Sequence, residues 1–313
     1  MTRPVPRLPR DPVPADLPVM VNLSTVPDAR PWLESLPSLI GAVAAEFGLR
    51  LGPPVHGGSC SWVAPARLPD GTPVMVKIGW PHREMYGEAA ALRVWDGNGA
   101  VRLLRHSPER HAMVLQRCVP GGRLGEAALP VADRIRAGCA VLRRLWAAPL
   151  PEAGELETLT AVAAEWADIV DERVVRLRPG YDPGLVELGA SLLRTLPHSA
   201  DRTVVLHGDF NPGNVLSAAG QGWLAIDPKP MVGDPAYDPW PLLEQITGGG
   251  LPFADRLELA GETLGCAPSR IAMWSLARTV NDAFWYASLG DMALGAEAMK
   301  VAREQADLLG RLQ

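Results

Sequence analysis

Three side chains in one part of the sequence could together carry out phosphoryl transfer. Asp209 and Asn214 are spaced D-x-x-x-x-N, and a second acid, Asp227, follows thirteen residues after the asparagine. The first carboxylate could accept the proton of an attacking hydroxyl, while the amide and the second carboxylate could bind the metal ions that neutralise nucleotide phosphates. Magnesium fits such a pair because it prefers oxygen ligands and keeps some of its water. The pattern predicts Asp209 as the catalytic residue and Asn214 and Asp227 as ligands of Mg²⁺.

The residues around this motif favour the same interpretation. Short apolar runs at 204–206, 215–216 and 224–226 predict strands that place both acids at strand ends. Asp and Asn are also common in ordinary turns, but that explains each residue singly and not their joint spacing. His207 is predicted to be a structural hydrogen-bonding residue rather than a base, because the acid two positions later already fills that role.

One lysine stands where a phosphate ligand would be needed. The chain has only three lysines among its 30 Lys and Arg residues, and Lys77 lies in an alternating apolar run. A lysine at the end of such a strand can contact the α- and β-phosphates of a nucleotide if a carboxylate holds its ammonium in place. Glu84 and Glu88 are the candidates, and being four apart they share one helix face. We favour Glu88; the alternative is a solvent-exposed lysine with both acids solvated.

Two further segments complete a predicted nucleotide site. Gly57, Gly58 and Ser59 open a glycine-rich stretch whose backbone amides could approach phosphates, although a β-bulge would explain these glycines equally well. Gln116 and Cys118 end a strand just before a glycine break, where backbone groups could pair with an adenine ring. ATP, or another nucleoside triphosphate, and Mg²⁺ are therefore the predicted cofactors.

Bulk properties limit the possible partners. The chain has 313 residues, 47% of them hydrophobic and 21% charged, and these are values typical of globular proteins. A net charge of −5 argues against a nucleic-acid partner. We see no signal peptide and no apolar run long enough for a membrane span. The four cysteines are far apart, which disfavours disulfides and zinc and favours a cytoplasmic location. The chain could be a monomer or a dimer.

The order of elements predicts two lobes of unequal size. Residues 1–30 are rich in proline and predict an extended N-terminal arm. Residues 31–118 predict a helix followed by a small mixed-sheet lobe that binds the nucleotide. After a glycine break, residues 119–313 predict a larger and mostly helical lobe with the catalytic loop and the acceptor site. The fold class is α+β, and the crevice between the lobes is the natural place for a ligand.

Several acids of the helical lobe are candidates for less direct roles. Asp234 and Asp238 lie in a turn before a helix and are predicted to accept hydrogen bonds from backbone amides and to brace the metal loop. Glu244 and Asp282 lie in the two helices expected to face the catalytic loop, where they could bind a cationic acceptor. Both could equally be exposed or paired with Arg278.

The sequence also resembles a known family. His-Gly-Asp-Phe-Asn-Pro-Gly-Asn-Val-Leu at 207–216 resembles the catalytic loop of the aminoglycoside phosphotransferases, and a block at 223–238 is similar to the aminoglycoside/hydroxyurea antibiotic-resistance kinases, which include streptomycin 6-kinases. This resemblance implies a protein-kinase-like two-lobed fold, ATP with magnesium, and O-phosphorylation of a small hydroxylated antibiotic such as a streptomycin-like aminoglycoside. Asn211 is a departure, because many relatives have His there. The proline-rich arm has no counterpart in the family pattern.

Two other functions remain open at this point. The same chemistry could act on a different hydroxylated acceptor, such as a peptide antibiotic, hydroxyurea or a metabolic alcohol. A nucleotide-binding pseudokinase that serves as a scaffold is disfavoured, because Lys77, Asp209, Asn214 and Asp227 are all present.

Overall fold

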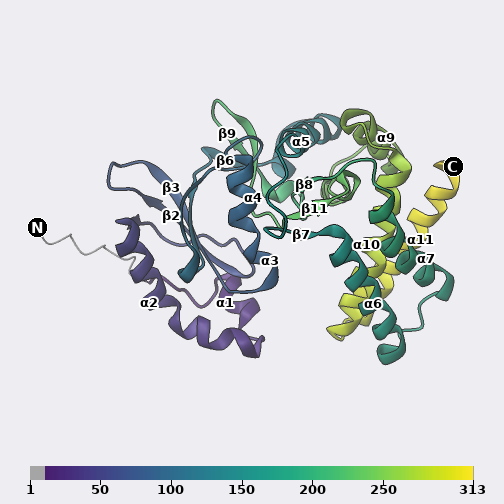
Figure 1. The fold of residues 1–313 in the computed structure, drawn as a ribbon, viewed down its shortest axis with the longest axis horizontal. Helices are drawn as coiled ribbons and strands as arrows, with labels where there is room; N and C mark the ends of the chain where they lie inside the picture. Colours follow the sequence, from purple (N-terminus) through teal and green to yellow (C-terminus); the bar gives the residue numbers. More distant parts are fainter. Residues whose placement is uncertain (1–10, 313) are drawn as a thin grey trace, which may run out of the picture.

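The smaller lobe is built on a five-stranded antiparallel sheet. A computed structural model describes residues 11–312, and Figure 1 shows this lobe on the left. The strands follow the order β1-β2-β3-β5-β4, and every neighbouring pair is antiparallel. Their bounds are β1 Arg50–Leu51, β2 Ser61–Arg67, β3 Pro73–Gly79, β4 Leu103–Ser107 and β5 Ala112–Gln116. We expected a mixed sheet, but tight connections join β2 to β3 and β4 to β5, and such connections produce antiparallel pairs.

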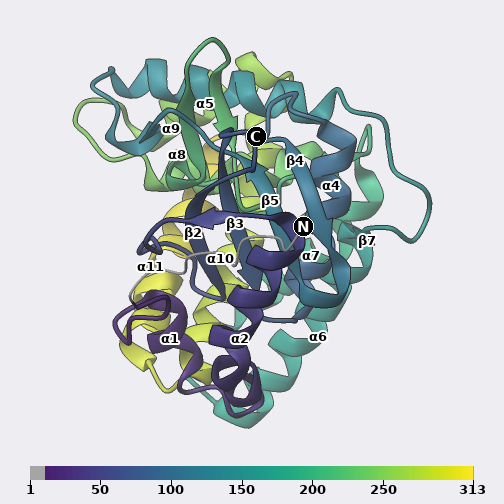
Figure 2. The same ribbon diagram turned by 90° about the vertical axis from the view of Figure 1, so that its left-hand side faces the viewer.

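The two faces of this sheet belong to different cores. Side chains alternate across a strand, so Val74, Val76 and Ile78 of β3 pack against α2 (Arg30–Phe47). Met75 and Lys77 lie on the opposite face, toward α4 (Glu88–Trp95), whose Leu92 and Trp95 join the core of the larger lobe. Lys77 is therefore directed at the junction between the lobes because of its register in the strand. Figure 2 looks onto this lobe, with α1 and α2 toward the viewer in its lower part and the larger lobe behind.

The prediction of an extended arm was wrong for part of its length. Residues 1–10 lie outside the described part of the chain, but residues 18–23 form the helix α1 (Pro18–Leu23). Proline is accepted in the first turn of a helix, where its missing N–H has no partner to lose. Leu17 and Leu23 are buried against α2, so this segment packs on the small lobe.

The larger lobe is mostly helical, with two three-stranded sheets. Its helices are α5 Val131–Trp146, α6 Leu159–Leu177, α7 Pro183–Thr195, α8 Trp240–Gln245, α9 Phe253–Leu264, α10 Pro268–Ser288 and α11 Met292–Leu312. One sheet has the order β10-β9-β6, from Gly222–Ala225, Val215–Ala218 and Pro120–Arg123. The other is mixed and has the order β7-β11-β8, from Glu157–Thr158, Met231–Gly233 and Val204–Leu206. None of the described helices is long and apolar enough to cross a bilayer.

These short strands position the chemistry. The loop with Asp209 and Asn214 runs from the end of β8 to the start of β9, and Asp227 follows β10. The sequence predicted all three strands and the placement of the acids beside them.

Candidate active site

Two asparagines hold Asp209. The side chain of Asn211 accepts hydrogen bonds from the backbone N–H of Gly213 at 2.9 Å and of Asn214 at 3.1 Å, which caps the short turn after it. Its Nδ2 donates to Oδ1 of Asp209 at 3.1 Å. The Nδ2 atom of Asn214 donates to the backbone oxygen of Asp209 at 3.0 Å. Asn211, the departure from the family pattern, thus fixes the orientation of the predicted catalytic carboxylate.

The backbone before Asp209 is clamped by a buried acid. Asp238 accepts hydrogen bonds from the N–H of His207 at 3.0 Å, of Gly208 at 2.9 Å and of the Trp146 indole at 3.0 Å. It therefore braces the catalytic loop rather than the metal loop. Gly208 has φ of +81°, and a Cβ atom there would lie 1.9 Å from the backbone oxygen of Lys229, so this position requires glycine.

His207 has the structural role expected from the sequence. Its Nε2 lies 3.0 Å from the backbone oxygen of Ile226, which only a protonated nitrogen can approach as a donor. Its Nδ1 accepts from the N–H of Asp209 at 3.3 Å, and the ring stacks on Trp95. Burial lowers the pKa of this histidine, so the neutral ring is the stable form. Both nitrogens are used in linking the two loops.

Lys77, Glu88 and Asp227 form an ion cluster in which Lys77 and Glu88 are buried and Asp227 is half exposed. The ammonium of Lys77 lies 2.6 Å from Oε2 of Glu88 and 2.5 Å from Oδ1 of Asp227. The partner favoured from the sequence is thus the one present. Burial disfavours the charge of Lys77, but the two carboxylates outweigh it and raise the pKa of the lysine. The same ammonium lowers the pKa of Asp227.

The predicted metal ligands lie side by side. The N–H of Ile226 donates to the backbone oxygen of Asn214 at 2.9 Å, which places Asp227 next to that residue. Asp227 has φ of +57°, an unusual value for a residue other than glycine that tends to occur at functional sites. Among the described residues, no three His, Cys, Asp or Glu side chains could hold a metal by themselves. A magnesium ion shared with nucleotide phosphates needs only one or two protein oxygens, and this pair can supply them.

Lys229 belongs to the same region and was missed as a site residue in the sequence, whereas Glu84 was considered only as a partner for Lys77. The ammonium of Lys229 lies 3.2 Å from Oε2 of Glu84 and 3.8 Å from Oδ2 of Asp209. Glu84 lies in α3 (Arg83–Tyr86), so it pairs with Lys229 and not with Lys77. Two features of the sequence could have indicated Lys229: lysine is scarce in this chain, and Lys229 lies two residues after Asp227.

The remaining nucleotide candidates lie at the edges of the small lobe. Gly57, Gly58 and Ser59 lie in the connection from β1 to β2, and the N–H of Val55 pairs with Val63 across that connection. Gln116 ends β5, and its side chain bonds with that of Gln221 at 2.6 Å. Burial raises the pKa of the Cys118 thiol to about 11, so this cysteine is a neutral group. Their roles toward a nucleotide stay predictions.

The two acceptor candidates lie close to each other in the helical lobe. Glu244 is in α8 and Asp282 in α10, and both side chains are open to solvent. Partial desolvation by the surrounding protein nevertheless raises the pKa of both carboxyl groups. The charge of Asp282 raises the pKa of Glu244 further, whereas the charges of Arg278 and Lys229 oppose the rise in the pKa of Asp282. The two acids and Arg278 therefore influence one another electrostatically.

Asp234 is a structural residue. It accepts hydrogen bonds from the Trp274 indole at 2.6 Å, from Arg270 at 2.7 Å and from the N–H of Ala236 at 3.0 Å. Its buried carboxylate is fully engaged in fixing the turn before α8.

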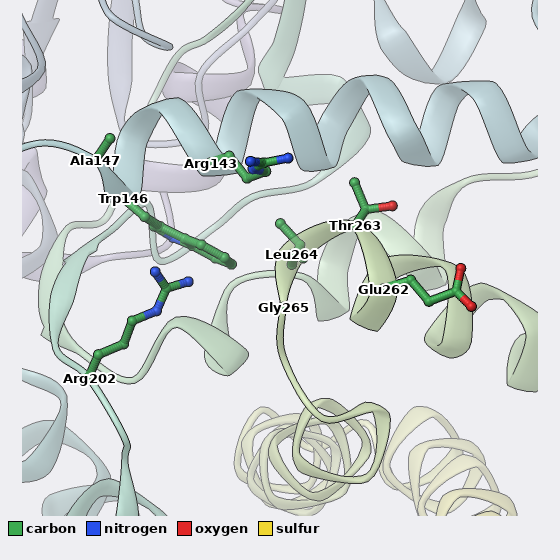
Figure 3. A pocket seen from close by; sticks show the side chains of 8 residues that line it. All are labelled: Arg143, Trp146, Ala147, Arg202, Glu262, Thr263, Leu264 and Gly265. Atoms are coloured by element: carbon green, nitrogen blue, oxygen red, sulfur yellow. The ribbon is translucent and has the colours of Figure 1, made fainter.

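A hollow of about 470 Å³ opens between α5 and α9, away from the residues predicted for the site. Figure 3 shows Trp146 and Arg202 facing it from one side and Thr263 and Leu264 from the other. It is connected to the catalytic loop through Trp146, whose indole donates to Asp238.

Comparisons with known proteins identify similar sequences. The family model described as "Aminoglycoside/hydroxyurea antibiotic resistance kinase" matches residues 52–290. The chain is 32% identical over 285 residues to a streptomycin 6-kinase of Streptomyces glaucescens, with 88% of this chain and 91% of that protein covered. It is 33% identical over 287 residues to a hydroxyurea phosphotransferase of Kitasatospora aureofaciens, with 90% of this chain and 81% of that protein covered.

Solved structures show the same fold. A spectinomycin phosphotransferase in complex with ADP and spectinomycin superposes with a TM-score of 0.58 at 14% identity, covering 86% of this chain and 98% of that one. At this identity the likeness bears on the fold alone, and that fold is the protein-kinase-like one expected from the sequence.

Proposed function

The chain belongs to the aminoglycoside/hydroxyurea antibiotic resistance kinases, and on that premise we propose that it transfers the terminal phosphoryl group of ATP to a hydroxyl of a small-molecule antibiotic. The observation that supports this most is the ion cluster of Lys77, Glu88 and Asp227 beside the loop of Asp209. A strand lysine held by a helix carboxylate next to a metal-binding acid is the arrangement that phosphoryl transfer uses to hold a nucleotide.

Each residue then has a definite task. Lys77 would contact the inner phosphates, and Asn214 and Asp227 would hold a magnesium ion, which would neutralise phosphate charge. Asp209 accepts the proton of the acceptor hydroxyl. The oxygen of that hydroxyl bonds to the terminal phosphorus while the bond from this phosphorus to ADP breaks. Asn211 keeps the carboxylate in position through its 3.1 Å hydrogen bond. Gly57, Gly58 and Ser59 cover the phosphates, and the backbone near Gln116 and Cys118 contacts the base.

A streptomycin-like aminoglycoside is the acceptor we favour. Its guanidinium and ammonium groups would pair with carboxylates, and Glu244 and Asp282 offer two on the adjacent helices α8 and α10. The streptomycin 6-kinase relative supports the same choice. We further propose that the enzyme acts in the cytoplasm, which fits the four free cysteines among the described residues.

Hydroxyurea is the second candidate, because its phosphotransferase is as similar to this chain as the streptomycin kinase is. Hydroxyurea is uncharged and small, so it would gain little from the two acids. The two acceptors therefore differ in their dependence on Glu244 and Asp282.

The test is a coupled assay of ADP release with each acceptor, followed by mass spectrometry of the product. If streptomycin is the acceptor, Glu244→Gln and Asp282→Asn should raise its KM, by roughly 10-fold or more for the loss of a charged hydrogen bond, and leave kcat less affected. Turnover of hydroxyurea that is unchanged in both variants, without streptomycin turnover, would favour the second candidate. A folded protein that binds no nucleotide would contradict both.

A further inference from the structure

Lys229 brings a positive charge to the predicted catalytic carboxylate. Its ammonium lies 3.8 Å from Oδ2 of Asp209, and its side chain is 46% exposed. Of the ion pairs formed by residues 11–312, this is the one that involves Asp209. The loop from 207 to 214 contains no Lys or Arg of its own, so the charge comes from the neighbouring segment.

The backbone of Lys229 is fixed against the catalytic loop. Its N–H donates to the backbone oxygen of His207 at 2.8 Å. Its own carbonyl oxygen occupies the place that a side chain on Gly208 would need. The ammonium therefore moves only by rotation of its side chain, within reach of Asp209.

Glu84 holds the other side of the ammonium. The 3.2 Å contact joins the large lobe to α3, and the preceding residue makes a similar connection. Arg83 pairs with Glu157 at 2.7 Å and with Glu165 at 2.6 Å, both in the large lobe. This four-residue helix is thus tied across the lobes at two successive positions.

The other lysine of the site already has two close carboxylate partners. The side chain of Lys77 is 9% exposed, and two carboxylates hold its ammonium. Lys229 is half exposed and faces partners at longer distances. Phosphoryl transfer spreads negative charge over the oxygens of the moving group, and a cation placed there stabilises that charge. Because Lys229 lies at the acid that activates the acceptor, it is placed to supply that cation.

We propose that Lys229 binds the phosphoryl group in transfer and that Glu84 is its partner while the site is empty of nucleotide. When the triphosphate binds, the ammonium leaves Glu84 for an oxygen of the terminal phosphate. Asp209 takes the proton of the hydroxyl, the new O–P bond forms, and the bond to ADP breaks. Lys229 returns to Glu84 when the products leave. This inference rests on the proposed function, since it assigns a role in the same reaction.

A binding comparison tests the proposal without catalysis. Calorimetry with Mg²⁺ would measure the affinity for ADP and for a non-hydrolysable ATP analogue, because only the analogue carries the terminal phosphate. For Lys229→Met we expect unchanged ADP affinity and a loss for the analogue of roughly 10- to 100-fold, the range for a hydrogen bond to a charged group. Lys229→Arg should retain part of the preference for the ATP analogue over ADP, and Glu84→Gln should retain all of this preference.

Lys300→Met is the matched control. The chain has three lysines, and Lys300 pairs with Glu297 on the exposed face of α11, so the control removes the same charge outside the site. It should bind both ligands like the wild type. In a coupled assay, Lys229→Met should lower kcat more than it raises KM for the acceptor.

The outcomes separate the inference from the function beneath it. If Lys229→Met keeps the wild-type ratio of analogue to ADP affinity, the role of Lys229 is refuted while the kinase function stands. An equal loss for both ligands would indicate a structural role and would also overturn the proposal. A wild-type protein that binds neither ligand would refute the proposed function itself.

Discussion

The catalytic carboxylate depends on its immediate neighbours in the chain. Asp209 receives a hydrogen bond from Asn211, and Asn214 holds its backbone oxygen. If Asp209 accepts the acceptor proton, Asp209→Asn should lower kcat by roughly 10²- to 10⁴-fold, the contribution of a positioned base. ATP affinity should change little, because the side chain contacts the hydroxyl and not the nucleotide. Steady-state kinetics and calorimetry measure the two effects; near-normal turnover in a folded variant would remove the assignment.

Gly208 allows a second test of the same loop. Its φ of +81° disfavours any side chain, and a Cβ would collide with the backbone of Lys229. Gly208→Ala should therefore displace the catalytic loop and reduce both kcat and stability, the strain alone costing about 1–3 kcal/mol.

Gly220→Ala is the control for this variant, since Gly220 also has a positive φ but open space around it. This control separates the cost of a positive φ from the cost of the steric clash between a Cβ atom at position 208 and the backbone of Lys229. Equal losses of activity in the two variants, measured by kinetics and chemical denaturation, would show that the close approach at Gly208 is not important.

At this scale the sequence predicts the residues of the motif better than their contacts. The choice of Glu88 over Glu84 was correct, because the apolar residues after Glu88 bring that helix against the core. Lys229 was not predicted as a site residue, because Glu84 lies far from it in sequence and no spacing rule connects the two. The orienting role of Asn211 depends on a capped turn that appears only in the folded loop.

At the scale of elements, one acid connects three segments. Asp238 precedes α8, accepts two amides of the catalytic loop and bonds with Trp146 of α5. Asp238→Asn would place an NH₂ group against N–H donors and leave buried groups unpaired, at a cost of about 1–3 kcal/mol. We expect lower kcat and lower stability. Trp146→Phe removes only one of the three hydrogen bonds and should lower the free energy of unfolding by less in a denaturation experiment. A larger loss in Trp146→Phe than in Asp238→Asn would contradict the bracing role of Asp238.

The helix α1 was the main error in the predicted fold. Proline content indicated an extended arm, but the apolar residues between the prolines pack on α2. Leu23 is 2% exposed, so Leu23→Ala should cost about 2–5 kcal/mol of unfolding free energy. Val21 in the same helix is 56% exposed, and Val21→Ala is the control expected to cost far less. Similar values for both in urea denaturation would mean that α1 does not pack in solution.

The strands were predicted well because apolar patterns report burial directly. The alternating run around Lys77 predicts β3, and the apolar runs at 204–206, 215–216 and 224–226 predict β8, β9 and β10. The pairing of strands is a different matter, since it depends on connections and on contacts between distant segments. This is why the sheet of the small lobe was expected to be mixed and is antiparallel.

At the scale of the whole molecule, the predicted site lies where the two lobes meet. The small lobe holds Lys77 on β3, while Asp227 and Asn214 belong to the large lobe, and the 2.5 Å ion pair crosses between them. A nucleotide with magnesium would add contacts to both sides of this junction. Ligands that bind only the folded state raise its stability by RT ln(1 + [L]/Kd), about 2.7 kcal/mol at a hundred times Kd.

The two metal ligands should therefore control how the whole protein responds to nucleotide. We expect ATP to raise the melting temperature of the wild type by a few degrees when Mg²⁺ is present and by less when a chelator removes it. Asp227→Asn keeps the size of the side chain but removes its charge, so the gain from Mg²⁺ should disappear while a smaller gain from ATP remains through Lys77. Lys300→Met, remote from the junction, should behave like the wild type. If Asp227→Asn retained the full magnesium-dependent rise in melting temperature, the metal ligands would have to lie elsewhere in the chain. The assignment of Asp209 as the base and Asp227 as a metal ligand would then be wrong.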